Sequence, residues 1–446
     1  HRIYEVKKLK EWIKDYVKSI GLVIGCAIAA ILLLTLAYMI PRDLFVKHIE
    51  ESENLLYALC DDNNINANID GYVYDTKTNI ITLEEVIAPR EHTAFQDALL
   101  APSSNYIRDF FGDWVNTLQN DAHAKAYSED NKLTYPRYWH GFVLFLKPMF
   151  VFFNLNEIYQ INTLILCGLC FATLLLIYKK EKAYVGPFLV LLALFNPPYI
   201  ARSFQLSSVF YAMILTCIMV LCWDDKEKRE HLFLYAFVID GIILAFLDFL
   251  TYPPVAFVVP LCFVLVFSEQ DLLHNLLASI RYGIAFLLGY AGMWVSKWIL
   301  ASLFTDENVI AEGIESVLHR TGKGAMSDVD SAFNVEISPA AAMRENLHAF
   351  GTRPVRIMVF LLLCAAVVLV IYMIRHKAGF TKRAAGMFVI FALLTIIPIV
   401  WIVALNNHCS LHPHLEWREW LVAVFAPLMW LAWFWTDRRK KAVECR

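Results

Sequence analysis

Runs of about 20 apolar residues recur along this chain, and they constrain its fold more than any other feature. A helix of that length crosses the roughly 30 Å hydrocarbon layer of a bilayer, because each residue adds about 1.5 Å. Only 18% of the 446 residues are charged, compared with about a quarter in soluble domains. Because helices satisfy their own backbone polar groups in lipid, the sequence predicts an all-α polytopic membrane protein.

Hydropathy predicts about ten transmembrane helices. The predicted spans cover residues 19–40, 158–178, 184–200, 204–223, 232–250, 253–267, 281–302, 355–375, 384–404 and 419–436. The run at 253–267 is short and follows "TYPP", so half of a broken helix pair is an alternative there. The apolar run at 139–154 is also short and predicts an interfacial or re-entrant helix.

Lys and Arg residues are distributed unevenly between the connecting segments, which predicts the orientation of the chain. Basic clusters recur on one side, at 7–14, 179–182, 224–230, 375–383 and 437–441. We therefore expect both termini in the cytoplasm, as an even number of spans requires, and an integral protein of the plasma (inner) membrane. The net charge of −3 gives no indication of nucleic-acid binding.

Two large segments then lie on the extracytoplasmic side, at about 41–157 and 303–353. Neither is long enough to predict an independent domain, so residues 1–446 are expected to form a single transmembrane domain. Within the first loop, residues 41–59 alternate apolar and charged positions with roughly helical spacing, which is typical of an amphipathic helix on the membrane surface. Residues 104–118 are a second candidate.

The first outer loop carries an acidic cluster in "CDDNNINANIDGYVYD" (60–75), with Asp61, Asp62 and Asp70 as candidate catalytic residues. A carboxylate near an apolar interface can have a raised pKa and act as a base, and adjacent carboxylates can bind a divalent cation. The alternative is a solvated acidic loop.

Arg137 and His140 lie in "LTYPRYWHGFVLFLKP" (133–148), where the first outer loop returns to the membrane. The Arg137 guanidinium suits a phosphate group, and His140 suits a base or a phosphate contact. The alternative is an aromatic belt, because Tyr and Trp are the residues that lie at headgroup level.

The last outer loop, "NNHCSLHPHLEWRE" (406–419), places His408, His412 and Arg418 between two spans. Histidines and a glutamate can bind a transition metal, but the spacing matches no metal signature, so no metal ligand is assigned. A polar site lining and an exposed loop are the other interpretations. Cys409 and Cys60 are the cysteines predicted outside the membrane, and a disulfide between them is chemically permitted.

Ionisable groups also fall inside or at the ends of predicted spans, where charges usually face the bundle interior. Asp240 lies near the middle of its helix and Asp248 near the outer end of the same helix. Lys297 is predicted at a similar depth to Asp248, so the two could pair, although Lys297 could instead extend to the interface. Arg202 adds a further cation at this level.

The predicted outer headgroup level therefore gathers cations beside carboxylates and histidines. These cations are Arg137, Arg202, Lys297, Arg353, Arg356 and Arg418. Such a set suits a lipid-linked phosphate or pyrophosphate whose tail lies in the bilayer and whose head faces outward.

This arrangement resembles the GT-C class of membrane glycosyltransferases, which take sugars from polyprenyl-phosphate donors. In that class the first span leads into a large outer loop, which begins with interface-lying helices and carries the acidic base, often in a two-acid motif. Here 41–59, followed by "CDDNN" (60–64) or "NID" (68–70), occupies the corresponding place. "PRDLFVKHIEES", "PRYWHGF" and "LDFLTYPP" are also similar to segments of bacterial membrane proteins with this layout.

The resemblance implies a GT-C-like transferase that moves a sugar from a polyprenyl-phosphate donor to a cell-envelope glycan acceptor on the extracytoplasmic face. Membrane lipids are further expected partners; no cofactor is required, and a divalent metal is possible. Three other functions stay open: a transporter or flippase of a lipid-linked or polar substrate, another lipid-dependent transferase (polymerase, ligase or phosphotransferase), and a non-catalytic membrane subunit.

Overall fold

The structure, a computed structural model, describes most of the chain. The described residues are 2–52, 55, 68–69, 72–73, 76–90, 92–103, 134–223, 229–323, 336–350 and 381–444, with a few positions between 356 and 375. The fold is helical throughout this part of the chain, apart from one small hairpin. In it, β1 (Asn68–Ile69) pairs antiparallel with β2 (Tyr72–Val73).

Seven helices of the described chain are long and apolar enough to cross a membrane, which confirms the predicted class. They are α1 (Arg2–Tyr38), α10 (Leu155–Lys180), α13 (Phe204–Cys222), α14 (Arg229–Leu247), α16 (Leu272–Phe304), α21 (Lys382–Ala404) and α24 (Trp420–Glu444). Each coincides with a predicted span. Of the other three predictions, the run at 355–375 lies mostly outside the described residues.

The remaining two predicted spans form helices too short to cross a bilayer, α11 (Val185–Phe195) and α15 (Pro253–Val266). Helix α11 ends at Asn196, whose left-handed backbone (φ 53°) precedes Pro197, so the predicted span 184–200 continues as a separate turn, α12 (Pro197–Ile200). Helix α15 is buried at all but one of its 14 residues, so it is a core element and does not face lipid.

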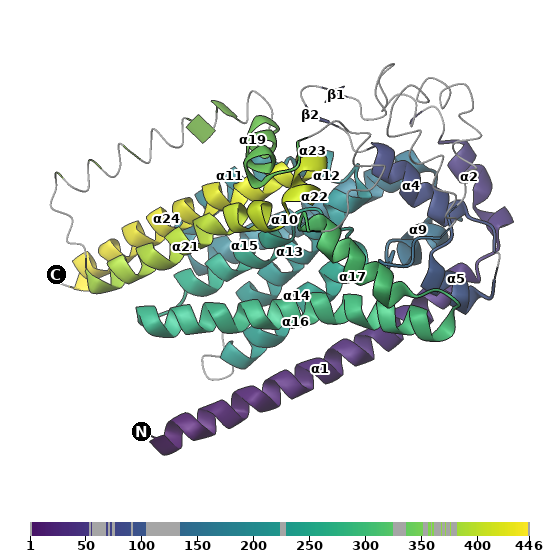
Figure 1. Ribbon diagram of the computed structural model, residues 1–446. Helices are drawn as coiled ribbons and strands as arrows, with labels where there is room; N and C mark the ends of the chain where they lie inside the picture. The colour runs from purple at the N-terminus through teal and green to yellow at the C-terminus, as the bar shows by residue number, and fades with distance from the viewer. Residues whose placement is uncertain are drawn as a thin grey trace.

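The start of α1 and the end of α24 lie at the same end of the bundle, at the left in Figure 1. We call this the terminal end, and we call the opposite end, where α14 stops and α15 starts, the distal end. Most of the short elements gather around the distal end. They are η1 (Arg42–Leu44), α2 (Val46–Glu50), α4 (Thr76–Ile87), α5 (Ala94–Leu100), α9 (Val143–Phe150), α17 (Val309–Arg320), α19 (Pro339–His348), α22 (Asn406–Leu411), α23 (Pro413–Glu416) and η3 (Trp417–Glu419), whereas η2 (Lys182–Tyr184) precedes α11.

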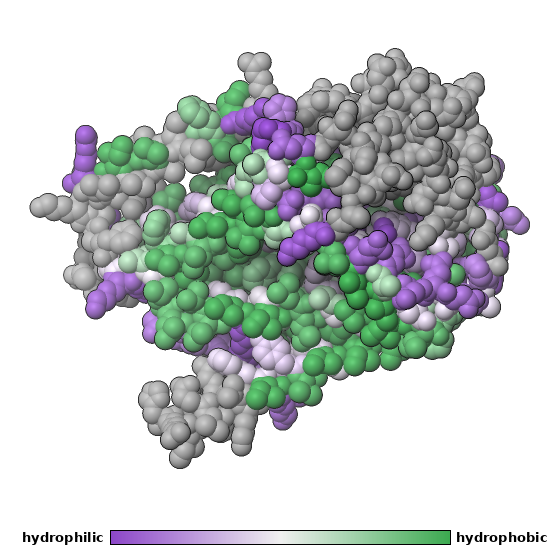
Figure 2. Space-filling view, in the orientation of Figure 1, coloured by the Kyte–Doolittle hydropathy of each residue, from purple (hydrophilic) through white to green (hydrophobic). Residues whose placement is uncertain are grey.

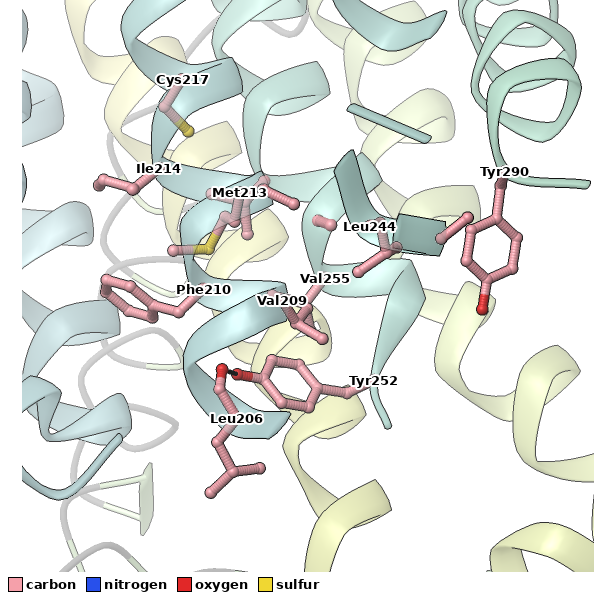
Figure 3. Close-up of a cluster of buried hydrophobic side chains, with 14 of the residues drawn as sticks. Leu206, Val209, Phe210, Met213, Ile214, Cys217, Leu244, Tyr252, Val255 and Tyr290 are labelled. Atoms are coloured by element: carbon pink, nitrogen blue, oxygen red, sulfur yellow. Dashed lines mark hydrogen bonds between the residues drawn. The ribbon is translucent and has the colours of Figure 1, made fainter. Parts of the chain in front are cut away.

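The core forms where α13, α14, α15 and α16 meet (Figure 3). Helix α13 contributes Leu206, Val209, Phe210, Met213 and Ile214, whose three- and four-residue spacing places them along one face. These side chains are completely buried. On the outside of the bundle, apolar residues form a continuous band in Figure 2, as expected for spans that contact lipid.

Two glycines let α14 and α16 cross with their backbones in contact. A Cβ atom on Gly241 would lie 2.2 Å from the Phe286 carbonyl oxygen, and one on Gly289 would lie 2.1 Å from the Val238 carbonyl oxygen. Small residues allow such close approach between membrane helices. A third glycine, Gly141, donates its backbone N–H to the Phe246 carbonyl at 2.8 Å, which fixes residues 134–142 against the end of α14.

A charged network joins α1 to α14 and α16 near the terminal end. The Asp15 carboxylate contacts Arg281 Nη2 at 3.1 Å and His231 Nδ1 at 2.6 Å. Glu230 contacts Arg281 Nη1 at 3.7 Å and His274 Nε2 at 2.9 Å. Each charged group of this network therefore has an oppositely charged neighbour.

The predicted interfacial elements are only partly recovered. Residues 139–154 contain the short helix α9, which agrees with the prediction that this run does not span. Residues 41–59 do not begin with one long helix: η1 and α2 are separate short segments, and Phe45 and Ile49 are buried in the protein. The candidate at 104–118 lies outside the described residues.

Candidate functional site

Two arginines from different segments meet at a pair of tyrosines at the distal end. Arg137 lies over the Tyr135 ring at 4.8 Å, and the Tyr135 and Tyr138 rings are 5.3 Å apart. Arg320, at the end of α17, hydrogen-bonds the Tyr138 hydroxyl and lies over the Tyr138 ring at 5.3 Å. Burial raises the pKa of Tyr138, and Arg320 and Arg137 oppose that rise, as cations close to the phenol must.

The described protein pairs the two arginines to different extents. Arg137 Nη1 contacts Glu312 of α17 at 3.0 Å, but its buried Nε has no hydrogen-bond partner in the described chain. Arg320 is half-buried, and no carboxylate partner for it is found among the described residues. This group of Arg137, Tyr138 and Arg320 is called the arginine–tyrosine group below.

His140 is buried and contacts Glu85 of α4. Its Nδ1 lies 2.7 Å from Glu85 Oε2, and its Nε2 donates to the Tyr135 carbonyl at 2.6 Å. The His140 backbone has a φ of 54°, a strained value for a residue other than glycine, which directs the ring between these partners. Burial raises the pKa of Glu85, and His140 opposes that rise. Both ring nitrogens are therefore engaged by the protein, and the role of His140 as a base or a phosphate contact stays a prediction.

Two lysines are almost completely buried beside these residues. Lys297 Nζ donates to the Ala98 carbonyl at 2.9 Å and lies 5.5 Å from the centre of a Trp139 ring. Lys147 of α9 lies over the Tyr38 ring at 4.4 Å, and burial lowers its pKa to about 8. Extension of Lys297 to the membrane interface was one of its two predicted alternatives. The buried position of its side chain contradicts that alternative.

Asp248 organises the turn between α14 and α15. Its Oδ2 accepts from the backbone N–H groups of Leu250 and Thr251, both at 2.9 Å, and its Oδ1 accepts from the Thr251 hydroxyl at 2.7 Å. Burial raises the pKa of Asp248 to about 6, while the hydrogen bonds from Thr251 oppose the rise. Asp248 and Lys297 thus bind different partners, and the expected ion pair between them is not found in the described chain.

The last outer loop contributes a carboxylate group that packs against this turn. His408 Nε2 contacts the Leu250 carbonyl at 2.7 Å and Glu416 Oε1 at 3.1 Å. Glu419, one helical turn after Glu416, is completely buried, and neither of its oxygens has a hydrogen-bond partner among the described residues. A buried carboxyl group without hydrogen-bond partners is costly, which makes Glu419 a candidate site residue.

The side chains of Arg418 and His412 contact other protein groups of the distal end. Arg418 is buried, and its guanidinium donates to the His414 and Leu415 carbonyls at 2.8 and 3.3 Å and to the Tyr199 hydroxyl at 3.3 Å. The His412 ring lies 4.9 Å from the His408 ring. The described protein therefore already supplies three acceptors to the Arg418 guanidinium, and its role in phosphate binding stays a prediction.

The other predicted residues are spread more widely. Arg202 is exposed, and its carbonyl accepts from Asn79 at 2.8 Å. Arg356 is exposed and donates to the Phe350 and His348 carbonyls. Asp61, Asp62, Asp70, Arg353 and Cys60 lie outside the described residues, so their predicted roles remain predictions.

The structure brings Arg137, His140, Lys297, Asp248 and His408 to one end of the bundle. The turn after α14 contacts both His140 and His408. The centre of the Phe249 ring lies 4.9 Å from the centres of the His140 and Tyr138 rings, and the Leu250 carbonyl accepts a hydrogen bond from His408. In the part of the chain that the structure describes, no group of three or more potential ligands could hold a metal ion.

Three residues of this region were not predicted: Arg320, Glu85 and Glu419. Arg320 ends an amphipathic pattern, "VIAEGIESVLHR" (309–320), whose helical spacing of apolar residues is readable from the sequence. Glu85 lies in "IITLEEVIAP" (80–89), where two acids interrupt an apolar run, a signal of a buried charge. Glu419 lies at the start of a predicted span, where an acidic residue is expected at the membrane–water interface and gives no signal of burial.

Comparison with protein-family models, with curated proteins and with solved structures gives no match for this chain. The distal end offers guanidinium groups for an anion at the arginine–tyrosine group, and buried carboxyl groups at Glu85 and Glu419 with oxygens that have no hydrogen-bond partner in the described chain.

Proposed function

We propose that the protein is a membrane glycosyltransferase of the GT-C type, which moves a sugar from a polyprenyl-phosphate donor to a cell-envelope glycan. The observation that carries the proposal is the convergence of Arg137 and Arg320 on the Tyr135–Tyr138 pair. A planar guanidinium group suits the oxygens of a phosphate, and here two of them contact the same pair of tyrosines. A phosphate is the part of such a donor that must be held while the sugar leaves.

In this proposal the reaction is a direct displacement at the sugar carbon. An acceptor hydroxyl loses its proton to a carboxylate of the first outer loop, Asp61, Asp62 or Asp70, and its oxygen attacks the anomeric carbon. The bond between that carbon and the phosphate oxygen breaks, and the polyprenyl phosphate leaves with the bonding electrons. Arg137 and Arg320 stabilise the negative charge that grows on the leaving phosphate.

The arrangement of the chain supports placing this reaction outside the cytoplasm. The basic clusters of the sequence fall on the side of the terminal end, which the positive-inside rule assigns to the cytoplasm. The arginine–tyrosine group lies at the distal end, so it would face the extracytoplasmic leaflet of the plasma membrane. A lipid-linked donor can approach that level from the bilayer while its head stays in water.

The assignment of the base is tested with the purified protein in nanodiscs, supplied with a panel of polyprenyl-phosphate sugars and envelope glycans. Mass spectrometry measures the free polyprenyl phosphate and the extended acceptor. We expect Asp61→Asn, Asp62→Asn or Asp70→Asn to abolish transfer without changing the unfolding temperature. Normal turnover in all three variants would exclude a base in this loop.

The lipid product separates the proposal from its alternatives. A glycosyltransferase releases polyprenyl phosphate, whereas a phosphotransferase that moves the phosphosugar releases a different lipid. A flippase leaves the donor intact and changes only the leaflet in which the head is accessible. Movement of the head between leaflets of a liposome without cleavage would replace the proposed function by transport.

A further inference from the structure

The outer face of α17 is apolar and uncovered by the described chain. Ile310, Ile314, Val317 and Leu318 are 39, 52, 41 and 46% exposed. Their spacing of four, three and one residues places them on a single face of the helix. A face this apolar on an isolated polar loop would be unfavourable in water.

The opposite face of α17 is fixed to the bundle, so the helix cannot turn its apolar side inward. Val309 is completely buried, and a Cβ atom on Gly313 would lie 2.5 Å from the Trp298 ring. Glu312 binds Arg137, and Arg320 binds Tyr138. Four contacts along 12 residues therefore set the orientation of the helix.

The apolar face of α17 continues the outer surface of α16. Val295, Ile299, Leu303 and Phe304 of α16 are 46, 42, 70 and 52% exposed, and α17 packs beside them through Gly313 and Trp298. The apolar band in Figure 2 extends along α16 toward the distal end. Because α16 is long and apolar enough to cross a membrane, this surface is where lipid would contact it.

We propose that α17 lies in the interfacial layer of the bilayer, with its apolar face against the acyl chains of the distal leaflet. The occupant of the face is lipid because the face is continuous with that of a spanning helix and has its apolar character. The polar side chains of α17 then face the protein, where Glu312 contacts Arg137 and Arg320 contacts Tyr138.

This inference rests on the exposed surface and not on the proposed glycosyl transfer. If it holds, Arg320 lies at the depth of lipid headgroups, where a phosphate on a membrane-embedded tail is presented. A transferase, a flippase and a non-catalytic subunit would all share this helix, so a failure of the proposed function would leave it standing.

The test measures the membrane depth of single fluorescent labels. Ile314→Cys and Leu318→Cys are each labelled with a small environment-sensitive fluorophore, in a background whose other accessible cysteines are serine. The protein is reconstituted in nanodiscs of phosphatidylcholine and phosphatidylglycerol. Quenching is compared between doxyl-labelled lipids, which act from the bilayer, and iodide, which acts from water.

Two matched positions calibrate the measurement. Leu287→Cys reports the middle of α16, where the side chain is 58% exposed on a span, and Arg344→Cys reports an exposed position of α19, whose side chain is 64% exposed. We expect labels at 314 and 318 to lose fluorescence to doxyl lipids, as at 287, and to resist iodide. Iodide quenching as strong as at 344 would overturn the proposal.

Resistance to both quenchers would also overturn it, because it would mean that protein covers the face. Crosslinking between two labelled chains would then identify a second copy as the occupant. Because two positions on one face are labelled separately, failure of one variant to fold leaves the other as a valid test.

Discussion

The two ends of the bundle hold buried charges in different ways. Near the terminal end, Asp15 and Glu230 each contact Arg281 and a histidine, and the buried atom of these side chains that has no hydrogen-bond partner in the described chain is Arg281 Nε. At the distal end, one Glu85 oxygen and both Glu419 oxygens have no hydrogen-bond partner in the described chain, and Lys147 lies on an aromatic ring.

This contrast separates a structural network from a candidate site. Pairing cancels much of the cost of burying a charge, so the terminal network can hold α1 against α14 and α16. Buried polar atoms without partners lower stability, and such groups are common where a ligand or a reaction uses them. The distal end is therefore where substitutions should separate stability from activity.

The largest expected effect is the loss of the terminal network. Arg281→Met leaves Asp15 without its arginine partner, and we expect the free energy of unfolding to fall by about 3–5 kcal/mol. Denaturant unfolding in detergent measures it. Arg344→Met is the control, because Arg344 pairs with Glu345 at the surface and its loss should cost less than about 1 kcal/mol. Equal effects of the two changes would remove the contrast between paired and surface charges.

The second effect should appear in activity and not in stability. Arg320→Gln removes a cation from the arginine–tyrosine group, and we expect sugar transfer to fall by about 10²–10³-fold. The free energy of unfolding should change far less than in Arg281→Met, because Arg320 is only half-buried. Transfer assays and unfolding are run on the same preparation. Full activity in this variant would exclude Arg320 from phosphate binding.

The third prediction concerns the pH dependence of stability at the distal turn. The pKa of Asp248 rises from its ordinary value of 3.8 to about 6 in the fold, so the folded protein holds this proton between those two values while the unfolded chain releases it. Stability therefore falls as the pH rises through this window, by about 3 kcal/mol in total.

Asp248→Asn should abolish that pH dependence. The amide oxygen can still accept the two backbone N–H groups, and the amide nitrogen can donate to Thr251, so the variant should be more stable than the native protein at pH 7. Unfolding measured from pH 4 to pH 7 tests this. An unchanged slope would mean that Asp248 is not the titrating group.

The smallest expected effect is an increase in the free energy of unfolding, whereas the first prediction is a decrease. Glu419→Met replaces a buried carboxyl group that has no partner with an apolar side chain of similar length, and should raise the free energy of unfolding by about 1 kcal/mol. Destabilisation by several kcal/mol would show that Glu419 has a partner beyond the described residues. Glu11→Met, at an exposed position of α1, is the control.

The sequence predicted the seven long helices because hydropathy is a strong signal over 20 residues. The sequence did not distinguish α15 from a membrane span. A helix that is apolar on every side has the same hydropathy pattern whether protein or lipid surrounds it. The sequence also predicted that Arg137 and His140 lie near the outer histidines, because all of these residues adjoin the outer ends of predicted spans.

The partners within that group were not predictable. His140 binds Glu85 and Lys297 binds Ala98 because of how α4 and α5 pack, and neither helix was predicted. Arg320 was not predicted because its contact with Tyr138 joins residues 182 positions apart. Such partnerships depend on tertiary contacts between residues far apart in sequence, which periodicity does not encode.

The glycine crossing of α14 and α16 limits how this protein can move. Sliding either helix past the other would bring a larger side chain to a contact that only glycine allows, so we expect the two helices to move together. Gly141 ties the 134–142 segment to the same body. We therefore expect Tyr138 and His140 to follow the end of α14 in any rearrangement of the distal end.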